Sequence, residues 1–280
     1  MRPLTLERAQ PGMALARTVY DVDGNALLQR GQLLTADHCA GLARHGVRTV
    51  YIEARHTDDI VIRDVIDDAT RLAAIKLMGR VLREIEALPL DADYELPILD
   101  LKRLANDFVD QLRRVRNITV NNADLKNLEN YTAAHSVNTA VLTVIIGLKA
   151  GMLLDPLYDL ALGALLHDLG KSRVPPEILN KPGKLTKEEF EIIKNHTEAG
   201  HKLITRHRDI PAPAAIIALQ HHEKCNANGY PRGLARDRIH EYARMAAVAD
   251  VFDALSSDRV YKKGMLPHMA LRIISGADST

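Results

Sequence analysis

Leu160-Ala-Leu-Gly-Ala-Leu-Leu-His-Asp-Leu-Gly-Lys171 is the stretch that decides the fold of this 280-residue chain. Leucine and alanine are strong helix formers, so the stretch predicts a buried helix that ends near His167-Asp168. An imidazole and a carboxylate side by side are both metal ligands, and two adjacent ligands can serve two neighbouring ions. The stretch therefore predicts a helical fold, and the case for a metal site at its end depends on the other histidines of the chain.

The composition is typical of a globular protein with a helical core. Hydrophobic residues make up 46% of the chain, charged residues 26% and aromatic residues only 4%, so aliphatic side chains and alanine must fill the core. A formal net charge of +1 gives no overall positive field for nucleic acid. The distant Cys39 and Cys225 are expected to be reduced thiols. No signal peptide and no run of ~20 apolar residues for a membrane span is visible, so a cytoplasmic protein is expected.

The chain divides into three parts of different pattern. Residues 1–57 are expected to form a small α+β domain, with two strands around the turn Asp23-Gly24 and a helix capped by Thr35. Residues 58–118 carry aliphatic side chains at helical spacing and are expected to form a helical connector. A dimer seam, which would make a homodimer, and a packed subdomain are the alternatives. Residues 119–280 are expected to form an all-helical bundle.

Helix signals divide this bundle into five helices. Thr186 and Glu189 form a capping box, which marks one helix start, and Pro213 marks another. The expected helices run from about 123 to 150, 156 to 168, 186 to 206, 213 to 222 and 239 to 256.

Each of these five helices carries one or two residues that can bind a metal. They are His135, His167-Asp168, His196, His221-His222 and Asp250. Five imidazoles and two carboxylates can hold two divalent ions, and this ligand set suits iron, manganese or zinc better than calcium. A single histidine near a helix end is more often a capping or packing residue. Asp250 is more telling, because it lies among apolar residues and a buried carboxylate needs a partner such as a cation.

In order and local context, these residues resemble the ligand pattern of HD-GYP phosphodiesterases. His167-Asp168 and Gly229-Tyr230-Pro231 give that family its name and stand here intact, and Ile178–Thr186 and Ala249–Lys262 also look like family segments. The resemblance covers about residues 120–275. It identifies 119–280 as an HD-GYP metal-dependent phosphohydrolase domain, an HD-type bundle in a mainly α protein.

The resemblance implies that cyclic di-GMP is hydrolysed to pGpG, with a further step to GMP left open, by a hydroxide that two metal ions activate. Iron or manganese is expected, with zinc, nickel or magnesium as alternatives. Asp168 would bridge the ions, and Lys171 would be the second catalytic residue. The residues expected to bind substrate are Lys171, Tyr230, Arg259 and Lys262. The loop at Gly229-Tyr230-Pro231 is expected to contact diguanylate cyclase (GGDEF) proteins.

Several positions depart from the family pattern. Asn226-Ala227 stands where members usually carry Asp-Gly, and because alanine resists a positive φ the loop is expected to sit differently. Tyr131 lies one turn before His135, where members with a third metal carry glutamate, so a two-metal site is expected. The last family helix is expected to be missing at the end of the chain.

Two other functions stay open. The first is a catalytically weak sensor or adaptor that binds a cyclic dinucleotide or a cyclase, which the altered loop would favour. The second is an HD-type hydrolase of another nucleotide, against which Gly229-Tyr230-Pro231 argues. Cyclic GMP-AMP also stands beside cyclic di-GMP as a substrate.

Overall fold

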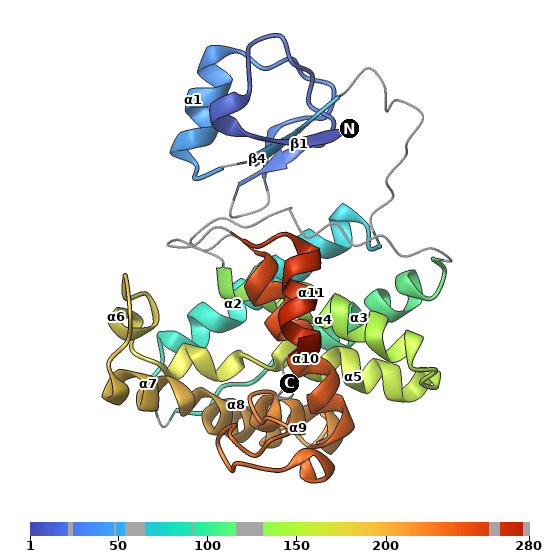
Figure 1. The fold of residues 1–280 in the computed structure, drawn as a ribbon, viewed down its shortest axis with the longest axis vertical. Coiled ribbons are helices and arrows are strands. Elements are labelled where there is room, and N and C mark those ends of the chain that lie inside the picture. The colour runs from blue at the N-terminus through green and yellow to red at the C-terminus, as the bar shows by residue number, and fades with distance from the viewer. Residues whose placement is uncertain are drawn as a thin grey trace.

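The computed structural model describes residues 1–21, 25–47, 49–53, 65–90, 92–115, 131–257 and 264–276. Figure 1 shows a small α+β unit at one end of the molecule and a larger group of helices at the other. Among the described residues, the strands all belong to the N-terminal unit. The mainly α fold class is therefore confirmed.

The N-terminal unit is built on two antiparallel strand pairs. They are β1 (Arg2–Thr5) with β4 (Thr49–Ile52), and β2 (Val19–Tyr20) with β3 (Ala26–Leu28). Helix α1 (Ala36–Arg44) begins as expected, because the Thr35 side chain accepts a hydrogen bond from the His38 amide. The expected turn at Asp23-Gly24 lies outside the described residues. The unit has an apolar core of its own, which is made of Leu15, Leu28, Leu34, Leu42, Val50 and Ile52.

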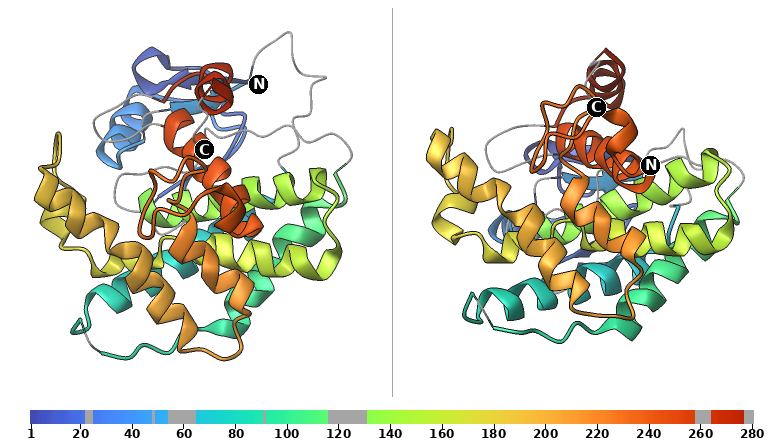
Figure 2. Two further views of the ribbon diagram at one scale, coloured as in Figure 1. Left: turned by 60° about the horizontal axis from the view of Figure 1, so that its bottom comes forward. Right: turned by 90° about the horizontal axis from the view of Figure 1, so that it is seen from below.

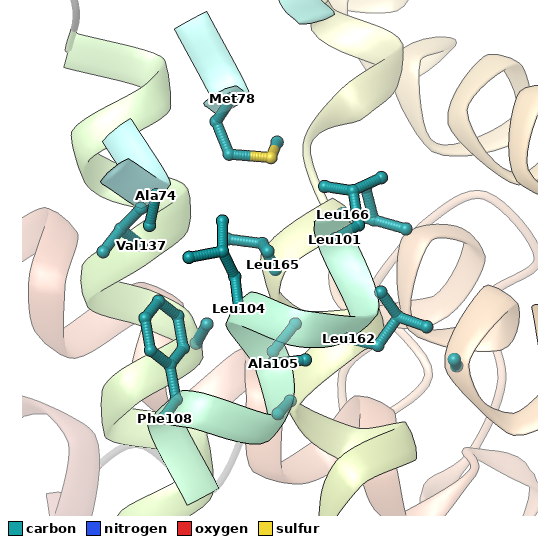
Figure 3. Packing of buried hydrophobic residues seen from close by; sticks show 14 of the residues in the cluster. Ala74, Met78, Leu101, Leu104, Ala105, Phe108, Val137, Leu162, Leu165 and Leu166 are labelled. Carbon is teal, nitrogen blue, oxygen red and sulfur yellow. The ribbon is translucent and has the colours of Figure 1, made fainter. Parts of the chain in front are cut away.

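Helices α2 (Asp68–Glu86) and α3 (Ile98–Leu112) bury their apolar faces in the same core as the C-terminal helices. Figure 3 shows Met78 of α2, Phe108 of α3 and Leu165 of the C-terminal helices in one packed region. These contacts correspond to the packed alternative for residues 58–118. The boundaries expected at 57–58 and 118–119 both fall outside the described residues.

The C-terminal helices pack around one another in a bundle. They are α4 (Tyr131–Lys149), α5 (Leu154–Leu166), the 3₁₀ helix η3 (Leu169–Arg173), α6 (Pro176–Leu179), α7 (Lys187–Lys194), α8 (His196–Thr205), α9 (Ala212–Gln220), the 3₁₀ helix η4 (Arg236–Arg238), α10 (Glu241–Ser256) and α11 (Pro267–Gly276). Helix α4 packs against α2, α5 and α10, and α9 packs against α5, α8 and α10. In Figure 2, α6 and α7 project from one side of this bundle.

The helix expected over 186–206 is in fact two helices, α7 and α8, which meet at Asn195. Its start is as expected, since both halves of the Thr186 and Glu189 capping box are present. It breaks where two side chains hydrogen-bond to the preceding turn: His196 Nδ1 lies 2.6 Å from the Ile193 carbonyl, and Thr197 Oγ1 donates to the Lys194 carbonyl. Such bonds compete with the backbone hydrogen bonds of a helix, and here they lie where the two helices meet.

Helix α4 is long and apolar enough to cross a bilayer, contrary to the expectation that no segment approaches that length. In the fold, however, 72% of its apolar window is buried. Its buried face includes His135 and Asn138. It serves here as the central helix of the bundle. Helix α11 has no counterpart among the expected helices, and residues 116–130, where α4 was expected to begin, lie outside the described residues.

Candidate metal centre

The seven residues expected to bind metal lie together in the bundle. His135 comes from α4 and Asp250 from α10, and the others come from the chain segments that end α5, begin α8 and follow α9. They form two groups, and within each group the ligand atoms all lie within 4.8 Å of one another. The groups are His135, His167 and Asp250, and Asp168, His196, His221 and His222.

Asp168 faces both groups. Its Oδ2 lies 3.2 Å from His167 Nε2 and 3.6 Å from His135 Nε2. Its Oδ1 lies 3.5 Å from His196 Nε2 and 3.7 Å from His221 Nε2. A carboxylate with one oxygen toward each group has the geometry to bridge two cations.

Backbone carbonyls fix the ring orientation of three imidazoles. The Nδ1 atom lies 2.8 Å from the Ala164 carbonyl in His167, 2.6 Å from the Ile193 carbonyl in His196, and 3.0 Å from the Ile217 carbonyl in His221. Since a carbonyl only accepts, each Nδ1 donates a hydrogen bond to it, and each ring is held so that its Nε2 faces the other ligand atoms. This is the usual way in which a protein prepares a histidine for a metal.

Two buried atoms of the seven expected metal ligands lack a hydrogen-bond partner among the described residues. They are His167 Nε2 and Asp168 Oδ1. An unsatisfied buried polar group costs about 1–3 kcal/mol, and both atoms here are lone-pair donors that point into the centre. Imidazole nitrogen and carboxylate oxygen are a donor set that divalent transition metals accept, so the residues fit such an ion.

The charges of the ligands are suited to a cation. Burial lowers the pKa of His196 to about 3 and that of His222 well below its ordinary value, so both imidazoles are neutral at pH 7. Burial alone would raise the pKa of Asp168, but His167 and Lys171 together lower it well below the usual range. The centre therefore offers an ionised carboxylate at Asp168 and neutral imidazoles at His196 and His222.

His135 lies between two carboxylates. Its Nε2 is 2.9 Å from Asp250 Oδ1 and its Nδ1 is 2.7 Å from Asp253 Oδ2. Burial alone would lower the pKa of His135, but the hydrogen bonds to Asp250 and Asp253 raise it to about 9. Asp253 was not among the expected site residues. Its place three residues after Asp250, on the same helix and face, is the signal that could have indicated it.

Two of the residues expected to bind substrate lie at the centre, and two lie outside the described residues. Lys171 Nζ is 2.5 Å from Asp168 Oδ2, and its side chain is 22% exposed, so it connects the centre to solvent. The Tyr230 ring stacks on His222, with centroids 4.7 Å apart. Burial raises the pKa of the Tyr230 hydroxyl, which therefore stays a donor. The two outside the described residues are Arg259 and Lys262.

Glu223 holds the loop that carries Tyr230. Its carboxylate is buried and accepts hydrogen bonds from the amides of Arg232, at 2.7 Å, and Leu234, at 2.8 Å. At Gly229 an added Cβ would lie 2.3 Å from the Lys224 amide nitrogen, so glycine alone fits this close approach. The loop is thus fixed by its backbone.

Ala227 has a positive φ of 61°. The expectation that alanine would keep the loop out of this conformation is therefore wrong, because the chain accepts the left-handed alanine at a cost of roughly 1–2 kcal/mol. The bond from the Asn228 amide to Asn226 Oδ1 helps to hold the turn.

Replacing Ala227 with glycine is expected to stabilise the protein by about 1 kcal/mol, because glycine adopts a positive φ without a Cβ clash. Urea unfolding measures the change. The control is Ala73→Gly at an exposed position in α2, which should destabilise by roughly 0.5–1 kcal/mol. A loss of stability in Ala227→Gly as large as in the control would contradict the strain assigned to Ala227.

A sequence profile of the HD domain family matches residues 121–279. This match spans more than half of the chain and includes every residue of both ligand groups. The chain belongs to the HD domain family. This HD domain contains His167-Asp168 and Gly229-Tyr230-Pro231. The profile match and the relatives described below together confirm the resemblance to HD-GYP proteins.

The relatives of this HD domain protein include named phosphodiesterases. A cyclic di-GMP phosphodiesterase of Pseudomonas aeruginosa is 42% identical over 174 residues, which are 60% of this chain and 42% of that protein. A cyclic di-GMP phosphodiesterase of Thermotoga maritima is 38% identical over 56% of this chain and 41% of its own length. A 3'3'-cGAMP-specific phosphodiesterase of Vibrio cholerae is 38% identical over 51% of this chain and 31% of its own length. The chain thus matches less than half of each of these relatives.

One solved structure shares the fold over almost the whole chain. It is Bd1817, an HDG"Y"P protein from Bdellovibrio bacteriovorus, with a TM-score of 0.54. The likeness covers 99% of this chain and 94% of that one at 18% sequence identity. At this identity the comparison speaks for the fold alone, including the N-terminal unit and the helices that follow it.

Proposed function

We propose that residues 119–280 form a metal-dependent phosphodiesterase that hydrolyses cyclic di-GMP to pGpG. The observation that carries this proposal is Asp168, whose two oxygens face two separate groups of ligand atoms. The names of the relatives support the substrate class.

Two divalent ions fit the donor atoms. One ion would be held by His135, His167 and Asp250. The other would be held by His196, His221 and His222, and Asp168 would bind both ions. When bound, the ions would lower the pKa of a water molecule to supply the nucleophile and would stabilise charge on the phosphodiester oxygens. Iron or manganese is proposed because imidazole and carboxylate ligands suit both. A third ion is not proposed, because Tyr131 supplies no carboxylate and instead stacks its ring on His135 at 5.8 Å.

The remaining site residues would act on the substrate itself. Lys171 would offer its ammonium group to a phosphate oxygen, since its side chain reaches solvent from the centre. Tyr230, fixed against His222, would donate its hydroxyl at the rim. Arg259 and Lys262 are proposed to bind the guanine or phosphate groups.

Purified protein loaded with Mn²⁺ or Fe²⁺ tests this function. We expect it to convert cyclic di-GMP to pGpG, and a parallel assay with 3'3'-cyclic GMP-AMP and a nucleoside triphosphate sets the substrate preference. Tight binding of cyclic di-GMP without turnover at full metal content would contradict the enzyme and favour an adaptor. A preference for the triphosphate would favour another nucleotide hydrolase.

We also propose a cellular setting for the protein. Cys39 and Cys225 form no disulfide, and α4 is buried within the bundle, which supports a cytoplasmic location. The loop at Gly229-Tyr230-Pro231 is proposed as a contact for diguanylate cyclase (GGDEF) proteins because Glu223 holds it in a fixed shape. A homodimer is also proposed, and its test is light scattering of the purified chain.

A further inference from the structure

Arg71 of α2 is a charged residue inside the protein. It is only 6% exposed, and its Nη1 donates to Asn138 Oδ1 of α4 at 2.8 Å. Burial of a guanidinium is costly unless its hydrogen bonds are made. Arg71 also lies outside the residues that the HD domain profile matches. The role of this buried charge is therefore inferred from the contacts that Arg71 makes.

The contact with Arg71 fixes the direction of the Asn138 amide. Arginine is only a donor, so the oxygen of the Asn138 amide must face it. The Nδ2 of Asn138 then points the other way and donates to Asp253 Oδ1 at 3.3 Å. Without Arg71, the buried Oδ1 of Asn138 loses this donor, and the side chain is no longer held in the position from which Nδ2 donates to Asp253.

Asp253 in turn fixes His135. The carboxylate is fully buried, and as an acceptor it requires a proton on the His135 Nδ1 atom at 2.7 Å. Ser257 Oγ donates to the other oxygen of Asp253 at 3.1 Å. The ring of His135 is thereby oriented so that Nε2 faces Asp250 at 2.9 Å and Asp168 at 3.6 Å.

We propose that Arg71 is a positioning residue for His135, acting through Asn138 and Asp253, and so sets the affinity of one of two metal ions. The inference rests on the proposed two-metal centre. The effect of Arg71 should be confined to the ion that His135 binds. The Nδ1 atoms of His167, His196 and His221 are held by backbone carbonyls near each residue in the chain, so they do not depend on Arg71. His135 instead depends on the Asp253 side chain of α10, which Arg71 of α2 supports through Asn138.

The test is a titration of the metal-free full chain with Mn²⁺. Calorimetry and electron paramagnetic resonance monitor the binding of each ion. Arg71→Met removes the donor and keeps an unbranched side chain of similar length. Loss of a residue that orients a metal-binding histidine typically lowers affinity by about 10–100-fold. We expect that loss for one ion, with the affinity for the other unchanged, and we expect Arg71→Lys to recover part of it.

Arg83→Met, at an exposed position of the same helix, is the matched control and should bind both ions like the wild type. Asn138→Ala breaks the same link without removing a charge, and it should weaken the same ion if Arg71→Met fails to fold. Unchanged binding of both ions in these variants, or an equal loss at both, would overturn the role of Arg71. A wild type that binds fewer than two ions would instead contradict the proposed centre.

Discussion

Replacing Asp168 with asparagine is expected to remove one or both metal ions and to slow hydrolysis of cyclic di-GMP by about 10³-fold or more, which is about 4 kcal/mol of transition-state stabilisation. The reason is the position of the carboxylate, whose oxygens lie 3.2 Å from His167 Nε2 and 3.5 Å from His196 Nε2. An amide keeps the shape but offers only one uncharged oxygen, so it cannot serve two cations. Metal content and turnover, measured on the same sample, test this expectation.

The control for this variant is Asp155→Asn, which makes the same chemical change at an exposed position in α5. It should keep both ions and the wild-type rate. Wild-type turnover by Asp168→Asn at full metal content would remove Asp168 from the mechanism. Retention of one tightly bound ion with no activity would still agree with it, because a single ion does not supply the proposed chemistry.

Replacing Gly170 with alanine is expected to destabilise the protein by about 3 kcal/mol or more, at the upper end of what overpacking costs. Gly170 lies in η3, where an added Cβ would be 1.9 Å from the His196 carbonyl oxygen and 2.5 Å from the Gly200 amide nitrogen. These are backbone atoms of α8 that cannot rotate away. Helix α8 must therefore move, and His196 moves with it from its place 3.5 Å from Asp168.

Urea unfolding and metal titration measure both consequences of Gly170→Ala. Gly41→Ala is the control, because Gly41 lies within α1 and its added Cβ would meet no atom within 4 Å. There alanine should stabilise by about 0.5–1 kcal/mol, since glycine loses more backbone entropy in a helix. If Gly170→Ala unfolds like the wild type and binds both ions, the close approach of η3 and α8 does not hold the site together.

Local sequence signals account for much of the fold. Thr35 and Thr186 cap α1 and α7 as expected, because capping depends on neighbours three residues away. The division between α7 and α8 could not be predicted in the same way. It depends on the side chains of His196 and Thr197, which bond to the preceding turn where the chain enters the centre. Tertiary position, rather than helix propensity, decides that break.

The site likewise has a part that local sequence predicts and a part that depends on tertiary contacts. Its seven expected metal ligands were predicted from their order and local context, which resemble the HD-GYP ligand pattern, and the structure brings them together. Asp253 and Arg71 could not be found from type, since neither is placed as a ligand. Their roles depend on contacts between α2, α4 and α10, which are far apart in sequence. The left-handed Ala227 is likewise a property of the loop as a whole, against the preference of the residue itself.

The rate of cyclic di-GMP hydrolysis as a function of bound Mn²⁺ tests the central claim most directly. The two ligand groups and the shared Asp168 predict that the metal-free chain is inactive, and that activity rises only as the second ion binds to each chain. Full activity with one ion bound, or none with two ions bound, would contradict a two-metal phosphodiesterase.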